Sequence, residues 1–441
     1  MRAVDREILR LAVPAFLALV AEPLFLISDA AIVGHLGTPE LAGLGVAAVV
    51  LQTVVGLCVF LAYGTTASVA RHLGAGDLRA ALAQGVDGVW LAVVIGTIAT
   101  VGGVLATPAL VGAFHTGADV AEHAETYLAI AFLGTTPLLV MLAATGVLRG
   151  LQDTRTPLLV AVVGNGLNIV LNVVLVHGLD MGIAGSALGS VAAQVISAGW
   201  FLVVVVRAAR EHGAPLSPDR AGILAAAHAA VALVVRTVAL RACLLVGTYA
   251  VTRVGTQASD VNVATHQVAI TLWSFLAFAL DAIAIAAQAL TGRALGSGDV
   301  DGTRRLTRRM VAWGWGSGIV AGLGLAAVSP FIGALFTSDP AVRDLLVPVL
   351  LVAALGQPVA GVVFVLDGVL IGAGDGTYLA WAGIVVLALY APAALWAATL
   401  PHGVVAVWVA MTVVFMGARW VLLSRRARSD RWLVTGASVV R

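Results

Sequence analysis

The stretch Arg71-His-Leu-Gly-Ala-Gly-Asp77 returns 222 residues later as Arg293-Ala-Leu-Gly-Ser-Gly-Asp299. At the same offset, Gly146-Val-Leu-Arg-Gly-Leu-Gln-Asp153 returns as Gly368-Val-Leu-Ile-Gly-Ala-Gly-Asp375. Residue type and spacing both match, so these landmarks indicate an internal repeat rather than a shared Gly-rich composition. We therefore predict two related halves, residues 1–212 and 213–441.

The composition of the chain excludes most soluble proteins. Of its 441 residues, 60% are hydrophobic and only 11% are charged, whereas soluble domains carry about 25% charged residues. We therefore do not expect a soluble enzyme, a nucleic-acid-binding protein or a disordered chain. Because a bilayer core needs about 20 apolar residues per helix, the sequence predicts an all-α polytopic membrane protein. Its twelve expected spans lie near residues 12–34, 42–66, 86–111, 125–147, 157–177, 182–206, 234–253, 263–290, 312–336, 345–372, 378–399 and 403–424.

The basic residues fix the expected orientation. Lys is absent, and 21 of the 25 Arg residues fall in the termini and loops on one side of the predicted spans. The positive-inside rule then places both termini in the cytoplasm. Each half has six spans, so the halves share one orientation and form a parallel repeat about an axis along the membrane normal. Two such six-helix lobes enclose a cleft, which is an architecture for alternating access.

The seventh span has an uncertain start. Residues 221–235 are apolar, but Arg236 and Arg241 follow them. This stretch is either an interfacial helix on the central loop or an earlier beginning of the seventh span.

Ionisable side chains at membrane depth are costly, so each one is a candidate functional residue. Glu22 and Asp29 are two turns apart in the first span and share a helix face. Pro14 and Pro23 interrupt hydrogen bonding in the same helix. An acidic face on a helix that can bend could act as a protonation switch, because burial disfavours a charged carboxyl. The alternative is a static carboxyl held by hydrogen bonds.

Amides and a hydroxyl could surround Asp29. Asn165, Asn168 and Asn172 share one face of the fifth span. Ser190 and Gln194, four residues apart, share a face of the sixth span. The competing interpretation is that these groups only join helices through hydrogen bonds.

The second half has different candidates, Asp281 and Asp367. At the repeat offset, Val59 stands in place of Asp281 and Thr145 in place of Asp367. Each Asp either lines the cleft with a role in coupling, or caps or pairs locally. Asp87 is close to a loop and is expected at the interface.

Several stretches, taken together, resemble the multidrug and toxic compound extrusion (MATE) transporters, and in particular their DinF-like branch. The likeness covers nearly the whole chain. The stretches are residues 23–37 (PLFLISDAAIVGHLG), 146–157 (GVLRGLQDTRTP), 168–172 (NIVLN), 280–288 (LDAIAIAAQ) and 366–375 (LDGVLIGAGD).

The resemblance implies twelve helices in two six-helix lobes and efflux of organic cations or drug-like compounds driven by protons or sodium. In that branch a first-span Asp couples the cation, which corresponds to Asp29. A first-span proline that bends on protonation corresponds to Pro14, a fifth-span Asn to Asn168 and a sixth-span hydroxyl residue to Ser190.

One departure from the family pattern bears on the coupling ion. Members with a well-formed first-lobe cation site often have Asp one turn after the fifth-span Asn, where this chain has Asn172. One carboxylate with neutral amides holds a bare hard cation less well than two carboxylates do. We therefore expect proton coupling rather than sodium coupling.

The alternatives to a drug transporter are a lipid flippase, an intramembrane enzyme and a passive channel. A lipid-linked precursor flippase of the wider superfamily would gain support if Arg236 and Arg241 both faced the cleft. The spans contain no DDxxD, HExxH or GxSxG motif of an intramembrane enzyme, and a passive channel does not explain the acidic, proline-containing helix. We expect no cofactor, no structural metal, no catalytic residue and no nucleic-acid partner; the partners are a small-molecule substrate and the lipid bilayer.

Overall fold

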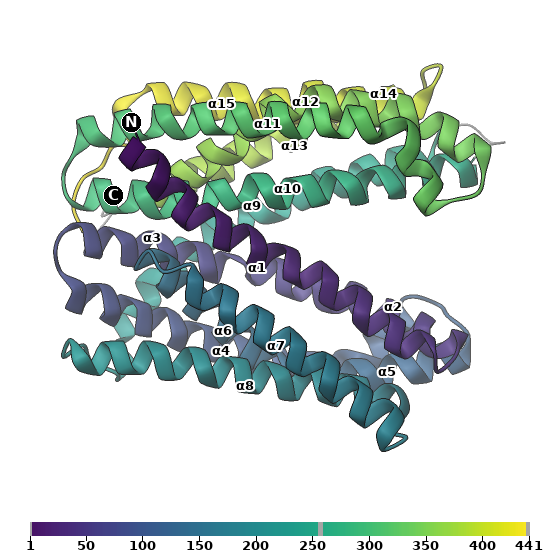
Figure 1. Cartoon of the computed structure of the whole chain (residues 1–441), viewed down its shortest axis with the longest axis horizontal. Helices are drawn as coiled ribbons and strands as arrows, with labels where there is room; N and C mark the ends of the chain where they lie inside the picture. Colours follow the sequence, from purple (N-terminus) through teal and green to yellow (C-terminus); the bar gives the residue numbers. More distant parts are fainter. Residues whose placement is uncertain (1, 255–258, 438–441) are drawn as a thin grey trace. The chain divides into compact units, whose positions relative to one another are not determined.

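The computed structural model of the chain describes residues 2–254 and 259–437, and this part contains helices and turns but no strand. Figure 1 shows the helices in chain order. The first eight α-helices and one π-helix are α1 (Arg2–Gly34), α2 (Thr38–Cys58), α3 (Phe60–Gly74), α4 (Leu78–Gly112), α5 (Ala118–Leu133), α6 (Thr135–Gly150), α7 (Arg155–Val173), η1 (Val174–Gly178) and α8 (Gly182–Glu211). The remainder are α9 (Arg220–Thr252), α10 (Ser259–Gly296), α11 (Val300–Phe336), α12 (Pro340–Gly372), α13 (Gly376–Ala397), α14 (Gly403–Ala410), η2 (Met411–Met416), α15 (Gly417–Arg428) and η3 (Asp430–Trp432).

These helices account for the predicted spans. In the described residues, eleven helical segments are long and apolar enough to cross a membrane. Helices α5 and α6 form a twelfth span if they are counted together, and they are bent by 48° at Gly134. The predicted all-α polytopic membrane fold is therefore confirmed.

The seventh span begins earlier than the predicted range of residues 234–253. Helix α9 runs without interruption from Arg220 to Thr252, so the apolar stretch 221–235 belongs to this helix. A separate interfacial helix is ruled out, because Arg236 lies inside a continuous α-helix.

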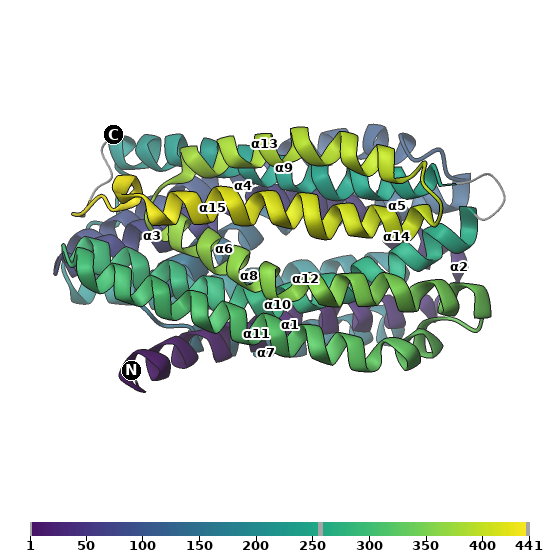
Figure 2. The same ribbon diagram turned by 90° about the horizontal axis from the view of Figure 1, so that it is seen from above.

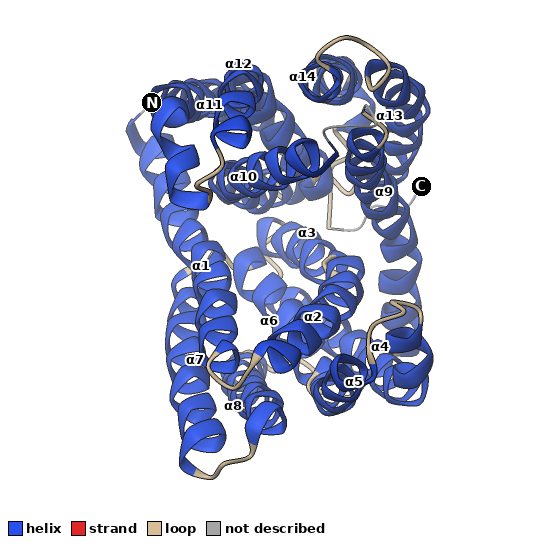
Figure 3. Cartoon of the chain, turned by 90° about the vertical axis from the view of Figure 1, so that its right-hand side faces the viewer, coloured by secondary structure: helices blue, strands red, loops and turns tan. Residues whose placement is uncertain are grey.

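The chain folds into two compact units, which are described separately. One contains Val13–Ala230, and the other contains Met1–Ala12 together with Val231–Arg441. In the first, α7 packs along α8 and α2 along α5, as Figure 3 shows. In the second, α12 packs against both α10 and α11, which lie beside it in Figure 2. The repeat boundary between residues 212 and 213 is a statement about sequence and stays a prediction.

Ion pairs explain why the first residues of α1 belong to the second unit. Nε and a terminal nitrogen of Arg309 donate to the two carboxylate oxygens of Asp5 at 2.6 and 2.7 Å. The indole of Trp313 donates to the same carboxylate at 2.9 Å. Arg293 donates to Glu7 at 3.0 Å. A bidentate Arg–carboxylate pair fixes geometry as well as charge, so these contacts anchor the start of α1 to α10 and α11.

The repeated turns have the same local structure. After α3, Gly76 has a φ of +80°, and after α10 Gly298 has a φ of +77°, a conformation that glycine adopts without strain. The next residue then caps the following helix in both places. Asp77 accepts from the backbone N–H of Ala80 at 2.8 Å, and Asp299 accepts from that of Gly302 at 2.7 Å. The sequence repeat is thus also a repeat of turn geometry.

Candidate functional site

Asp29 lies in α1 and is only 4% exposed. Its Oδ1 accepts hydrogen bonds from Ser186 Oγ at 2.6 Å and from Asn172 Nδ2 at 2.9 Å. Its Oδ2 accepts from the Tyr127 hydroxyl at 3.2 Å. Four helices therefore converge on this carboxyl: α1, α5, α7 and α8. We call Asp29, Tyr127, Asn172 and Ser186 the Asp29 cluster.

Local packing holds the Asp29 cluster in place. Asn172 is fully buried near the end of α7, just before the π-helix η1. Its amide oxygen fits against Gly189 of α8, where an added Cβ would collide with it. The Tyr127 hydroxyl also contacts Ser186 and Ser190. Contacts with neighbouring helices thus fix the orientations of these side chains.

Apolar residues surround the Asp29 cluster. Tyr127 belongs to a buried group drawn from α1, α2, α4, α5 and α8, which includes Val33, Leu44, Val111 and Phe132. Within the described residues, no basic side chain contacts Asp29. The carboxyl is therefore held by neutral donors alone, in surroundings where a charge is expensive unless it is hydrogen-bonded.

The other candidates of the first half occupy neighbouring positions. Asn168 donates to Ser190 at 3.1 Å, and both are buried. Asn165 donates to the backbone carbonyl of Ala21 in α1 at 3.1 Å. Gln194 does not reach Asp29; its amide oxygen packs against Gly134, at the bend between α5 and α6. The three Asn side chains of α7 therefore join this helix to both α1 and α8.

Pro14 and Pro23 lie inside α1, which remains one helix from Arg2 to Gly34. Pro14 comes two residues after Ala12, where the chain passes from one compact unit to the other. The side chain of Glu22 lies outside the described residues.

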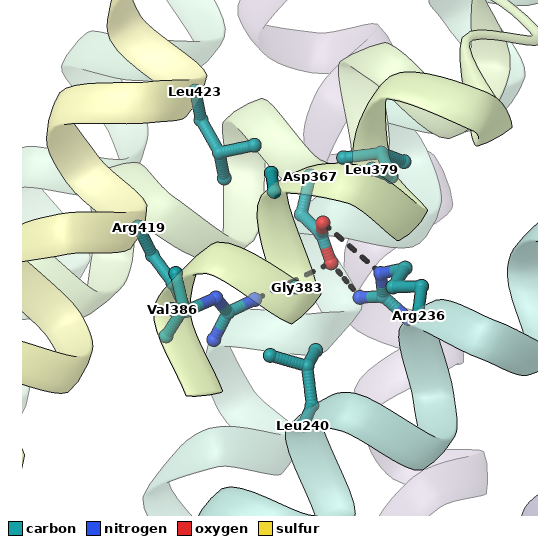
Figure 4. A pocket seen from close by; sticks show the side chains of 9 residues that line it. Arg236, Leu240, Asp367, Leu379, Gly383, Val386, Arg419 and Leu423 are labelled. Atoms are coloured by element: carbon teal, nitrogen blue, oxygen red, sulfur yellow. Dashed lines mark hydrogen bonds and ion pairs between the residues drawn. The ribbon is translucent and has the colours of Figure 1, made fainter. Parts of the chain in front are cut away.

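A second buried carboxyl lies in the other unit and has the opposite surroundings (Figure 4). Asp367 of α12 forms an ion pair with Arg236 of α9. One terminal nitrogen and the Nε of Arg236 each contact one oxygen of the carboxylate. A terminal nitrogen of Arg419, in α15, lies 3.5 Å from Oδ2 of Asp367. The side chains of Arg236, Asp367 and Arg419 are 11%, 9% and 8% exposed. Two guanidinium groups therefore share one buried carboxylate, and we call these residues the Asp367 triad.

The remaining ionisable candidates lie elsewhere. Asp281 is half-buried in α10 and does not line the pocket of the Asp367 triad. Arg241 is exposed. Asp87 is 6% exposed and accepts a hydrogen bond from the backbone N–H of Asp219 at 3.1 Å, and its expected interfacial position stays a prediction. This hydrogen bond fastens the segment that leads from α8 into α9.

Three contributors were missed in the sequence. Ser186 lies one turn before Ser190 on the same face of α8, so helical periodicity could have included it. Tyr127 and Arg419 contact their carboxyls from positions 98 and 52 residues away. No local spacing predicts such contacts. In the sequence, Arg419 lies close to the Arg-rich C-terminal end and looks like an exposed basic residue, although the structure buries it.

The described residues contain no group of three or more His, Cys, Asp or Glu side chains arranged to hold a metal ion. The Asp29 cluster offers one carboxylate together with hydroxyl and amide oxygens. Chemically, its carboxylate can accept a proton, and its hydroxyl and amide groups can exchange hydrogen-bond partners.

A polytopic helical fold with a buried carboxyl on a proline-containing helix favours a membrane transporter. A family model confirms the class: the MatE model matches residues 14–174 and 232–396. The chain therefore belongs to the MatE family, the multidrug and toxic compound extrusion transporters, and it is not an enzyme.

Relatives and solved structures agree with this assignment. DNA damage-inducible protein F of Escherichia coli (strain K12) is 32% identical over 447 residues, covering 97% of this chain and 94% of that protein. Protein DETOXIFICATION 44, chloroplastic, of Arabidopsis thaliana is 33% identical over 404 residues, covering 87% of this chain and 75% of that protein. The crystal structure of a Vibrio cholerae MATE transporter in its bent form has the same fold, with a TM-score of 0.88 at 19% identity, covering 98% of this chain and 99% of that chain.

Proposed function

We propose that this transporter exports organic cations or other drug-like amphiphiles from the cytoplasm in exchange for protons, and that Asp29 binds the proton. Alternating access between two six-helix lobes supplies the transport cycle. The proposal places both termini in the cytoplasm, as the distribution of Arg residues favours, and the chain in the cell membrane, as its similarity to a bacterial relative suggests.

The environment of Asp29 is the observation that carries the proposal. Three neutral donors hold the carboxylate, and none of them is a cation that would keep it permanently charged. A protonated Asp29 would need an acceptor for its own O–H. The amide oxygen of Asn172 is buried and has no hydrogen-bond partner in the described structure, so a small rearrangement of that amide supplies the acceptor.

Competition between proton and substrate provides the coupling. With Asp29 ionised, the substrate-loaded state is favoured; with Asp29 protonated, release to the outside is favoured. The two ligands can shift the lobes only by their differential affinity for the two states. Helix α1 carries Asp29 in one unit and its anchored first residues in the other, so bending at Pro14 would transmit the change.

The donor set supports protons over sodium. A bare sodium ion needs several oxygen ligands, and hard cations favour charged ones. The Asp29 cluster contains one carboxylate, because Asn172 occupies the position of a second. The membrane potential contributes only when net charge moves: one charge crossing 100 mV releases about 2.3 kcal/mol, enough for a gradient of roughly 50-fold. One-for-one exchange of a monovalent cation for a proton is driven by the pH gradient instead.

The alternative function is a lipid-linked precursor flippase, which would gain support if Arg236 and Arg241 both faced the cleft. Arg236 is bound by Asp367 and Arg241 is exposed, and whether they face the cleft stays a prediction.

Transport into liposomes tests the proposal. The purified chain is reconstituted with a fluorescent organic cation, and a pH gradient or a sodium gradient is imposed separately. We expect the pH gradient alone to drive transport, and Asp29→Asn, which cannot ionise at this position, to abolish it. Transport driven only by sodium would overturn proton coupling.

A matched acid provides the control. Asp87→Asn removes a buried carboxyl of the same unit whose contact is structural, and it should leave proton-driven transport in place. Equal losses in both variants would mean that Asp29 is merely structural. A fluorescent lipid assayed in parallel would favour the flippase if only the lipid moves.

A further inference from the structure

The Asp367 triad lies around a pocket of the second unit, between α9, α12, α13 and α15 (Figure 4). Besides the triad, the lining is apolar and includes Leu240, Leu379 and Leu423. The charged groups of this lining are two guanidinium cations and one carboxylate. The lining itself therefore contains one more positive group than negative groups, and a buried charge is costly unless it is paired.

The weakly bound cation is Arg419. Arg236 holds Asp367 through two nitrogens. By contrast, the terminal nitrogens of Arg419 lie 3.5 Å from the carboxylate and 3.9 Å from the sulfur of Met416. Charge-assisted hydrogen bonds are normally about 2.7–2.9 Å, so the donors of Arg419 are poorly used.

Aromatic side chains hold Arg419 ready for another partner. Its guanidinium carbon lies 5.5 Å from the ring centroid of Phe415 and 5.8 Å from that of Phe364. Such cation–π contacts stabilise the cation but occupy none of its N–H groups. They orient the planar guanidinium group without forming hydrogen bonds to its N–H donors, and this planar set of donors is suited to binding an anion.

The geometry points to a binding site for one small monovalent anion, a halide or the carboxylate group of a short-chain acid, held by Arg419 beside Asp367. The leucines would contact the polarisable ion or the alkyl part of the acid. The cavity volume is only about 10 Å³, far below the roughly 300–1,000 Å³ of pockets that enclose drug-sized ligands. The site is therefore distinct from one for an organic cation, and it does not rest on the role of Asp29.

Anion-dependent thermal stability tests this site. The full chain in detergent is unfolded at constant pH and ionic strength in sodium chloride, sodium acetate or sodium gluconate, with tryptophan fluorescence as the signal. Any ligand that binds the folded state raises the midpoint. We expect a saturable rise with chloride or acetate relative to the bulky gluconate.

Two arginines of the same helix give a matched pair of variants. Arg419→Gln should weaken anion binding by about 10- to 100-fold, as expected for losing a hydrogen bond to a charged group. Arg426, two turns later, is bound to Asp375 at 2.6 and 3.0 Å and does not line the pocket. The Arg426→Gln variant should retain the rise of the unfolding midpoint with chloride or acetate. An equal rise in both variants would show a general salt effect and overturn the site.

A variant with the opposite expected sign guards against loss of folding. Asp367→Asn removes the carboxylate that competes for both guanidinium groups, so it should bind the anion more tightly and depend on it for stability. Identical midpoints in all three salts, for the wild type and for Asp367→Asn, would contradict the proposal. Asp29→Asn should keep the anion effect, which separates this test from that of proton coupling.

Competition identifies the source of the anion. A rise with chloride that acetate cannot reproduce indicates a free halide ion. A rise with acetate that prevents further stabilisation by chloride indicates the carboxylate group of an organic solute.

Discussion

Two of the buried carboxyls of this transporter, those of Asp29 and Asp367, have opposite kinds of partner. Asp29 is held by two hydroxyl groups and an amide, whereas Asp367 is held by two guanidinium groups. Hydrogen bonds from neutral donors stabilise a carboxylate but still allow it to be protonated. A pair of adjacent cations favours the charged form much more strongly. The comparison teaches that burial alone does not make an acid a proton carrier; the charge of its partners decides.

The largest expected difference is in stability. Asp367→Asn leaves Arg236 and Arg419 buried without their carboxylate, which should cost about 3–5 kcal/mol of unfolding free energy. Asp29→Asn should cost only about 1 kcal/mol, because a neutral amide can still accept hydrogen bonds from neutral donors. Chemical unfolding in detergent without small anions measures both. Equal costs would remove the distinction between the two carboxyls.

Changing the partner charge near Asp29 should change the coupling ion. Asn172→Asp adds a second carboxylate within hydrogen-bonding distance of the first. Two carboxylates favour a hard cation with oxygen ligands, so we expect about a tenfold gain in sodium affinity, equivalent to about 1.4 kcal/mol. Sodium-driven transport in liposomes is the readout. If sodium still drives nothing, the amide is not what disfavours sodium in the wild type.

Removing one neutral donor should shift the pH dependence of transport. Ser186→Ala deletes the shortest hydrogen bond to Asp29, at 2.6 Å. That bond stabilises the ionised form, so its loss favours protonation, and half-maximal transport should move to higher pH by about one unit. Tyr127→Phe deletes the longer bond of 3.2 Å and should shift the profile less. A shift to lower pH would contradict the assigned roles.

The smallest effects should occur where the halves are alike. Asp77 and Asp299 occupy equivalent turns and cap their helices through bonds of 2.8 and 2.7 Å. Replacing either with Ala should cost about 1 kcal/mol, and the two costs should agree. Melting temperatures of the two variants measure this. Very different costs would show that the repeated turns no longer share one structural role.

Much of the fold could be predicted because each span is determined by its own composition. The start of α9 was ambiguous for the same reason: residues 221–235 are apolar without specifying whether the helix lies in the membrane or at its surface. Within one helix, spacing predicted a shared polar face for Asn165, Asn168 and Asn172. The partner of each Asn could not be predicted, because it depends on how α7 packs against α1 and α8.

Contacts between distant segments account for the residues that were missed. Tyr127 reaches Asp29 from α5, and Arg419 reaches Asp367 from α15. Both look ordinary in sequence: a tyrosine in an apolar run, and an arginine near a basic terminus. Their roles arise only from tertiary packing, which a hydropathy pattern does not encode.

The central claim is that Asp29 exchanges a proton while Asp367 stays ionised. Infrared difference spectroscopy of the reconstituted chain measures this directly, by following the carbonyl band of protonated carboxyl groups as the pH is lowered. We predict a band that appears on acidification in the wild type and in Arg426→Gln, and that is missing in Asp29→Asn. A band that persists in Asp29→Asn, or a band that is lost in Asp367→Asn, would contradict the account.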